Sequence, residues 1–218
     1  MNYDAINAKV SAMRASLLKP HDYAALASGR AASPPVMPED RLFPLISDMR
    51  LRRLLTEKNY LHIWQGIKSL PDQQNRRAIR LIKGTEVDLL NIMWIYRLKV
   101  FLAGQPGQIY PYLIPIQFRL GRGILKVLTD CPGRAELLAE LQYTYYAHVF
   151  GSFGHMEKSY AQEMRRTYSI ASKRYPRSVA RLMGYLFDKE IETQNCHAIA
   201  EGIRYQLSPE EIFASLRL

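Results

Sequence analysis

Two segments of the chain carry the same polar residues at the same spacing. Residues 86–95 read EVDLLNIMWI and residues 190–199 read EIETQNCHAI, so each has acids at its first and third places, Asn at its sixth and Ile at its tenth. Two carboxylates so close together could act as a general acid and a general base. On a helix, however, residues two apart point to opposite sides. The paired acids are therefore poor candidates for acid–base catalysis.

Both segments are expected to be helical, and each places its Asn in an apolar stripe. At about 100° per residue, one stripe holds Val87, Asn91, Trp94, Ile95, Leu98 and Leu102, and the other holds Ile191, Asn195, Ala198, Ile199 and Gly202. A buried amide without partners costs roughly 1–3 kcal/mol, so both Asn side chains must find partners. We expect each Asn to mark the same kind of helix–helix contact, which indicates duplicated architecture rather than chemistry.

No recognised catalytic motif accompanies the repeat. A phosphate-binding loop of the form GxxxxGK[ST] is absent, and Gly121 and Gly123 are not followed by a Gly-Lys pair. No Ser stands in a GxSxG context, and no two His residues form an HxxxH pair. Cys131 and Cys196 have no second Cys or His at metal-ligand spacing. We therefore expect no enzymatic activity, no cofactor and no metal site.

Basic and aromatic clusters leave a second hypothesis open. The formal net charge is +10, and residues 1–85 hold 14 Lys and Arg against 7 Asp and Glu. The arginines at 50–53 and 76–80 could contact phosphates, and the tyrosines at 143–146 could stack on bases. Such clusters are more often solvated surface and core, and no helix-turn-helix, RNA-binding sheet or zinc finger is recognisable. A basic helical nucleic-acid-binding or adaptor module is the alternative hypothesis.

Apolar residues recur at helical spacing along most of the chain, with Pro and Gly between the helices. We expect helices at 3–18, 21–26, twice between 42 and 70, at 72–102, after Pro115, and at 134–150, 156–175 and 179–205. A capping box opens a last helix with Ser208, Pro209 and Glu211. No segment shows the alternation with β-branched residues that is typical of strands. The sequence therefore predicts an all-α protein.

No segment is apolar for the roughly 18–20 residues that span a bilayer. The most apolar stretch, 89–96, ends at Arg97, and the N-terminus has no apolar signal core. We therefore expect a cytoplasmic protein that is at most peripheral to the cytoplasmic face of a membrane.

Several segments, in this order, resemble one protein family. They are YDAINAKVSAMRASLLKPHDYAALA at 3–27, KGTEVDLLNIMWIYRLKVFL at 83–102, YLIPIQFRLGRGIL at 112–125, LQYTYYAHVF at 141–150 and YLFDKEIETQNCHAIAEGIRYQLSPEEI at 185–212. Together they are similar to the C subunit of archaeal and bacterial V/A-type ATPases, whose eukaryotic counterpart is the d subunit.

This resemblance implies an all-helical, non-catalytic protein built from three similar lobes around a central opening. Such a protein is a socket on the proteolipid ring that grips the rotor shaft, so that torque passes between ATP hydrolysis and proton or sodium transport. The family's acidic-Asn helix is matched twice, by Glu86, Asp88 and Asn91 and by Glu190, Glu192 and Asn195. With Arg97, these residues are the predicted partner or lobe contacts.

Family members are considerably longer than 218 residues, and this chain carries only two copies of the marked helix. We therefore predict one all-helical domain, 1–218, in which two similar lobes, at about 42–130 and 131–218, form a helical bundle and one lobe is missing or reduced. A helical segment at 1–27 and a linker at 28–41 precede the lobes. The predicted partners are the rotor shaft subunits and the proteolipid ring.

Overall fold

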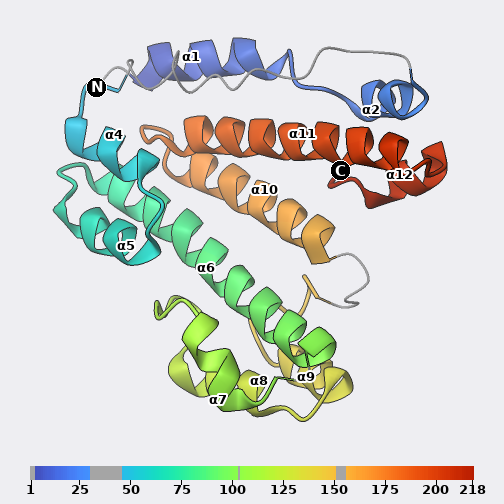
Figure 1. Ribbon diagram of the computed structural model, residues 1–218. Coiled ribbons are helices and arrows are strands. Elements are labelled where there is room, and N and C mark those ends of the chain that lie inside the picture. The colour runs from blue at the N-terminus through green and yellow to red at the C-terminus, as the bar shows by residue number, and fades with distance from the viewer. Residues whose placement is uncertain (1–2, 30–45, 103, 151–155) are drawn as a thin grey trace.

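The computed structural model describes residues 3–29, 46–102, 104–150 and 156–218, and within them every regular element is a helix (Figure 1). The helices are α1 Tyr3–Arg14, α2 Pro20–Ala27, α4 Met49–Thr56, α5 Tyr60–Ser69, α6 Gln73–Leu102, α7 Pro106–Ile109, the short 3₁₀ helix η2 Tyr110–Tyr112, α8 Arg122–Asp130, α9 Arg134–Leu141, α10 Met156–Arg174, α11 Ala180–Arg204 and α12 Pro209–Ser215. The predicted all-α class is confirmed for these ranges. Apart from residues 28 and 29, the predicted linker lies outside them.

Helix α6 runs between the two ends of the molecule and joins the helices gathered at each end (Figure 1). Asp72 opens it, because its carboxylate accepts a hydrogen bond from the backbone N–H of Asn75 at 3.0 Å. Half of its 30 residues are buried, on several faces. A helix buried on several faces needs neighbours on several sides. Helices α5 and α10 pack along it, and α7, α8 and α9 gather at its C-terminal end.

Helices α10 and α11 form a hairpin, and α1 lies along the outer side of α11 (Figure 1). The turn of the hairpin is tied to α6, since the backbone N–H of Val179 donates to the Asn75 side chain at 3.0 Å. Helix α1 is held by Ile6 and Val10, which are buried, and by an ion pair between Arg14 and Asp188 at 2.5 Å. Polar contacts therefore supplement a narrow apolar face on this helix.

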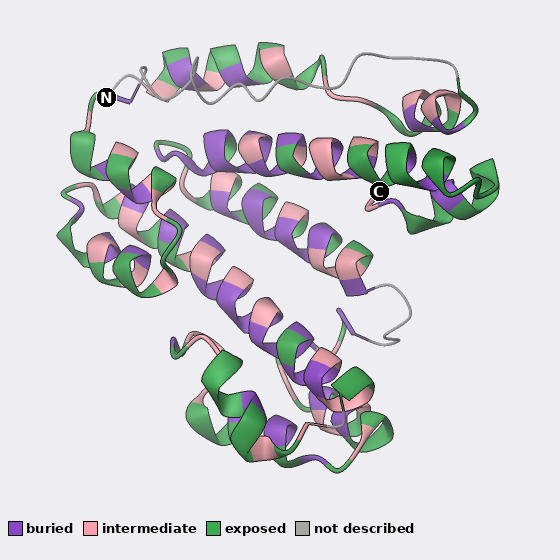
Figure 2. Ribbon diagram, viewed as in Figure 1, coloured by how far each residue is buried: buried purple, intermediate pink, exposed green. Residues whose placement is uncertain are grey.

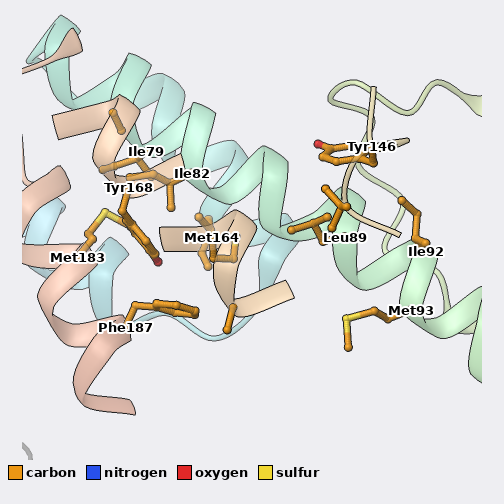
Figure 3. Close-up of a cluster of buried hydrophobic side chains, with 14 of the residues drawn as sticks. Ile79, Ile82, Leu89, Ile92, Met93, Tyr146, Met164, Tyr168, Met183 and Phe187 are labelled. Carbon is orange, nitrogen blue, oxygen red and sulfur yellow. The ribbon is translucent and has the colours of Figure 1, made fainter. Parts of the chain in front are cut away.

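One main apolar cluster extends through the molecule from α1 to α11. Figure 3 shows Tyr168, Met183 and Phe187 near the start of α6 and Tyr146 beside Leu89 further along it. A second, smaller cluster joins α2, the end of α11 and α12. Residues of both predicted lobes belong to the main cluster, and the division into lobes stays a prediction.

The helix predicted at 134–150 is shorter than expected, because α9 ends at Leu141 and turns follow. Thr144 explains the stop: its hydroxyl donates to the Leu141 carbonyl at 2.8 Å and accepts from the backbone N–H of Tyr146 at 3.2 Å. A Thr side chain that binds nearby backbone groups competes with helix continuation. The turns carry Tyr146 and Phe150 into the core, where both are fully buried.

Gly84 lets an irregular segment approach α6 closely. A Cβ atom at this position would lie 2.4 Å from the ring of Phe118, closer than carbon atoms approach one another. Gly123, in the exposed part of α8, has nothing within 4 Å of the same position. Packing against Phe118 therefore requires glycine at position 84, whereas position 123 has room for a side chain and serves as a control.

Gly84→Ala is expected to lower the free energy of unfolding by about 1–3 kcal/mol, because the added methyl group displaces Phe118. Gly123→Ala is expected to leave stability unchanged or to raise it by up to about 1 kcal/mol, since Ala favours the helix. Urea denaturation of both variants measures the difference. Equal stability of Gly84→Ala and the parent protein would show that Phe118 does not pack on α6 in this way.

Candidate functional site

In the first repeat, Asp88 and Asn91 are buried and bind the backbone of the irregular segment between η2 and α8. The Asn91 side chain accepts a hydrogen bond from the N–H of Ile114 at 2.8 Å and donates to the carbonyl of the same residue at 3.0 Å. The Asp88 carboxylate accepts from the N–H groups of Arg119 at 2.9 Å and Leu120 at 3.3 Å. One turn of α6 therefore holds this segment at two places, Ile114 and residues 119–120, although the segment has no regular secondary structure of its own.

The same oxygen of Asp88 also accepts a hydrogen bond from the Tyr146 hydroxyl at 2.9 Å. Its other oxygen has no hydrogen-bond partner in the described part of the chain. Burial raises the pKa of Asp88 to about 6, although the donors from Arg119, Tyr146 and Leu120 oppose the shift. Burial and the neighbouring carboxylate raise the pKa of the Tyr146 hydroxyl. Asp88 is thus a carboxyl group that carries its charge inside the protein only above mildly acidic pH.

In the second repeat, Glu192 and Asn195 are buried and play the same part. Glu192 accepts a hydrogen bond from the N–H of Leu18 at 2.8 Å and contacts the ammonium group of Lys189. Asn195 accepts from the N–H of Arg217 at 3.0 Å. The second copy therefore fixes the segment after α1 and the segment after α12.

The two Asn contacts are equivalent in the chain. Each Asn oxygen accepts from a backbone N–H 23 or 22 residues further on. In both copies a long helix ends, a capped short helix with Pro near its start follows, α7 or α12, and an irregular segment then returns to the Asn. The expected helix–helix contact is wrong for Asn91, and at Asn195 the backbone partner is also an irregular segment, although this Asn interacts with the Tyr23 side chain on α2 as well. Helix interiors have no free N–H groups, whereas irregular segments do.

Eight of the eleven residues in the two predicted stripes are buried, and three are exposed. Trp94 and Leu102 are 38% and 71% exposed, and Ala198 is also exposed. The exposed Trp94 stacks on Tyr112 of η2, with ring centroids 6.2 Å apart. Leu102 is the last residue of α6, so the apolar pattern there continues to the end of the helix although the side chain is exposed.

The remaining predicted positions, Glu86, Arg97 and Glu190, line one cavity of about 640 Å³ among α5, α6, α10 and α11. Glu86 accepts a hydrogen bond from the Tyr60 hydroxyl at 2.8 Å, and Arg97 pairs with Glu157 at 2.5 Å. The first acid of each repeat therefore faces a shared cavity, while the second binds backbone. The pairs 86/88 and 190/192 diverge in space, as their spacing on a helix predicts.

Three of the six arginines considered for phosphate binding make contacts within the chain. Arg52 donates to the carbonyl of Ile46 at 2.7 Å, and Arg76 donates to the carbonyl of Pro71 at 3.0 Å. The guanidinium of Arg80 lies over the ring of Trp64, 5.2 Å from its centroid. These contacts give the arginines structural roles at helix ends and over an aromatic ring.

The tyrosine cluster divides between core and surface. Tyr146 is fully buried, as the core interpretation predicts, but Tyr143 is 86% exposed and Tyr145 is 47% exposed. The guanidinium of Arg119 lies 3.6 Å from the ring centroid of Tyr145. The exposed rings follow from the early end of α9, which the helical pattern did not predict.

The ranges that the structure describes contain no group of three or more His, Cys, Asp or Glu arranged to hold a metal ion. Both cysteines are free thiols. None of the helices in these ranges is both long and apolar enough to cross a membrane.

Comparison with known proteins places these features in a family. The family described as ATP synthase (C/AC39) subunit matches residues 44–214, a range that includes both repeats. This chain belongs to that family. The resemblance predicted from the order of the sequence segments is thereby confirmed.

Two relatives of this C/AC39 chain are C subunits of A-type ATP synthases. The protein from Methanobrevibacter smithii is 25% identical over 158 residues, which cover 68% of this chain and 41% of the relative. The protein from Methanothermobacter thermautotrophicus is 25% identical over 150 residues, which cover 64% and 39%. The matched region of this chain thus spans about two fifths of the length of these relatives.

Sequence reasoning missed two buried or half-buried polar residues that join distant segments. Asn75 binds the hairpin turn and also donates to the hydroxyl of Tyr3 at 2.5 Å. Asp188 pairs with Arg14 and, at 3.1 Å, with Arg165. Neither residue belongs to the repeat, and no pattern in a single sequence distinguishes them from ordinary helix polar residues.

A third feature could have been found by counting charges. Residues 89–129 contain five Lys and Arg and no Asp or Glu. The same range holds seven exposed large apolar side chains, which are Trp94, Phe101, Leu102, Tyr110, Tyr112, Ile124 and Val127. This end of the molecule, formed by the C-terminus of α6 with α7 and α8, is therefore both basic and apolar, and Figure 2 shows much of it as exposed.

Asn91→Leu and Asn195→Leu are each expected to lower the free energy of unfolding by about 1–3 kcal/mol, because the first leaves the N–H and carbonyl of Ile114 and the second leaves the N–H of Arg217 without a partner. Gln65→Leu, at an exposed amide of α5, is the matched control, with an expected change within about 0.5 kcal/mol. Chemical denaturation gives all three values. Near-zero effects for both Asn variants would show that neither buried contact stabilises the fold.

The raised pKa of Asp88 predicts how the folding stability of the protein depends on pH. Because its folded-state pKa is about 6 and its ordinary value is 3.8, the folded protein binds this proton more tightly than the unfolded chain. Stability should therefore fall as pH rises from about 4 to 6. Asp88→Asn keeps one oxygen for the three donors and removes the buried charge. We expect this variant to lose that part of the pH dependence and to gain up to about 2 kcal/mol above pH 6 relative to the parent.

Asp88→Ala serves as the control for this experiment, since it removes the acceptor as well as the charge. It should be destabilised at every pH, because the N–H groups of Arg119 and Leu120 lose their partner. Urea denaturation across the pH range measures all three proteins. Parallel pH profiles for the parent and Asp88→Asn would contradict the raised pKa.

Proposed function

We propose that this chain is a non-enzymatic coupling subunit of a V/A-type rotary ATPase, and that it links the rotor shaft to the membrane proteolipid ring. The observation that carries the proposal is the family match over residues 44–214. The description of both relatives as C subunits of A-type ATP synthases supports it. No bond is made or broken in this role, so the requirement on the protein is mechanical.

A part that transmits torque has to resist deformation. Helix α6 has 30 residues and is about 45 Å long, and the main apolar cluster joins it to α10 and α11. The irregular segments would be the soft places in such a body. Asp88, Asn91, Glu192 and Asn195 fix these segments by buried hydrogen bonds, which supports a role in stiffness for the repeated residues.

Within this proposal, the predicted polar positions divide into two kinds. Asp88, Asn91, Glu192 and Asn195 act within the chain and position its loops. Glu86, Arg97 and Glu190 line the 640 Å³ cavity and are the positions proposed to contact a neighbouring lobe or partner. The excess of positive charge suits a place beside anionic headgroups at the cytoplasmic face of the membrane.

Co-expression with the shaft and ring subunits from the same cell tests the proposal. We expect an affinity-tagged copy of this chain to co-purify with the membrane complex, because a protein with the coupling role bridges the shaft and the ring. A complex that assembles intact while this chain stays in the soluble fraction would remove the rotor role.

A labelled oligonucleotide titrated at several salt concentrations tests the alternative. A protein with the coupling role should bind it weakly or not at all. Tight binding that weakens steeply with salt would instead support the nucleic-acid hypothesis.

A further inference from the structure

An apolar groove of about 330 Å³ lies beside α8 and is unrelated to the polar cavity of the repeats. Its apolar lining includes Tyr110, Leu113, Ile116 and Leu125, and its polar lining includes Arg122 and Lys126. We call this the α8 groove. Its volume is at the small end of ligand pockets, so it suits a few apolar side chains rather than a large cofactor.

One wall of the α8 groove is held in place by hydrogen bonds from side chains of α6. It is the irregular segment that Asn91 binds at both backbone groups of Ile114 and that Asp88 binds at Arg119 and Leu120. The N–H of Ile116 donates to the carbonyl of Ile114 at 2.8 Å. With these backbone groups already paired, the wall offers side chains rather than a free strand edge to a partner. A preformed wall also reduces the entropy cost of binding.

The second repeat shows what covers such a wall. Leu216, after α12, stands where Leu113 stands after η2, since each directly precedes the residue whose N–H binds the repeated Asn. Leu216 is 2% exposed because it belongs to the small cluster formed with Tyr23 and Ala27 of α2. Leu113 is only partly buried and faces the groove. A helix supplied by the chain itself thus covers one copy, and among the described residues the α8 groove shows no such cover.

The charges around the α8 groove define its occupant further. Arg122 is exposed and has no ion pair in the described ranges, and Lys126, whose side chain is 72% exposed, forms an ion pair with Asp130 at 3.0 Å. Neither Asp nor Glu lines the groove, and the acid-free range 89–129 surrounds it in sequence. Complementary charge favours encounter with an acidic partner.

We propose that the α8 groove binds an acidic amphipathic helix of a partner protein, in the position that α2 occupies on the second repeat. The helix places apolar residues at the i, i+3, i+4 and i+7 positions against Leu113 and Leu125 and directs carboxylates to Arg122 and Lys126. A second copy of this chain fits poorly, because its charge is also +10. A flat bilayer does not reach the lining of a groove as a helix does. The inference rests on the groove's own contacts and does not require the rotor role.

Fluorescence anisotropy tests this with a labelled synthetic helix of about 14 residues, Leu at the i, i+3, i+4 and i+7 positions and Glu elsewhere. The same peptide with Lys in place of Glu and a scrambled Glu peptide are the ligand controls. We expect the Glu peptide alone to bind, more weakly at high salt. Sedimentation with phosphatidylcholine–phosphatidylglycerol vesicles tests the lipid alternative, and gel filtration tests self-association.

Substitutions at exposed residues separate the groove from the general surface charge. Arg122→Glu combined with Lys126→Glu, and separately Tyr110→Ser, should each weaken peptide binding at least about tenfold. Arg50→Glu combined with Arg53→Glu, at two exposed arginines on α4, and Tyr143→Ser are the matched controls and should leave affinity unchanged. Circular dichroism and thermal midpoints confirm that each variant is folded.

Equal binding of the Glu, Lys and scrambled peptides would overturn the proposal, as would groove variants that bind like the parent. Binding to anionic vesicles without binding to the peptide would assign the surface to lipid instead, and self-association lost in the groove variants would assign it to a second copy. Failure of co-purification with the rotary complex leaves the peptide result intact, so the two proposals fail separately.

Discussion

The structure depends on one constraint, that buried backbone N–H and carbonyl groups need partners. Long helices satisfy their own groups, but the segments that connect them at the ends of α6 and α11 do not. Asp88 and Asn91 on one helix and Glu192 and Asn195 on the other supply the missing partners. Polar residues at the same places in two helices are therefore what allows irregular chain to be buried against them.

Burying a carboxylate costs free energy, and this cost differs between the two copies of the repeat. Glu192 has the ammonium group of Lys189 beside it, whereas Asp88 has only neutral N–H and O–H donors within hydrogen-bonding distance and one oxygen without a partner in the described ranges. Burial therefore raises the pKa of Asp88 to about 6, and its charge is less well compensated. The fold keeps the carboxylate because a single oxygen there joins Arg119, Leu120 and Tyr146, three groups from two segments.

The sequence was sufficient for most of the helices, because Pro, Gly and capping residues mark most of their ends, although α7 and η2 were not predicted and α1 ends at Arg14 rather than at residue 18. It failed at 134–150, where the hydroxyl of Thr144 ends α9 through contacts that apolar periodicity does not register. It identified Asn91 and Asn195 as buried and equivalent, but not their partners. Helical periodicity shows on which face of a helix a residue lies. Whether its partner is Ile114 or Arg217 depends on the path of a loop that comes back to the helix, and periodicity does not determine that path. Asn75 and Asp188 were missed for the same reason, since their partners are far away in the chain.

The two copies also show how one framework can carry different surfaces. In both, a short capped helix is followed by an irregular segment pinned to the repeated Asn, with Ile109 and Ile212 buried beneath. The second copy is finished by α2, whose Tyr23 and Ala27 close the small cluster. The first instead continues into α8, which adds Arg122 and Lys126 and leaves apolar side chains exposed beside them. Because the pinned framework is the same, the two copies differ in their cover: α2 of the same chain packs on the second copy, whereas no helix in the described ranges covers the groove of the first.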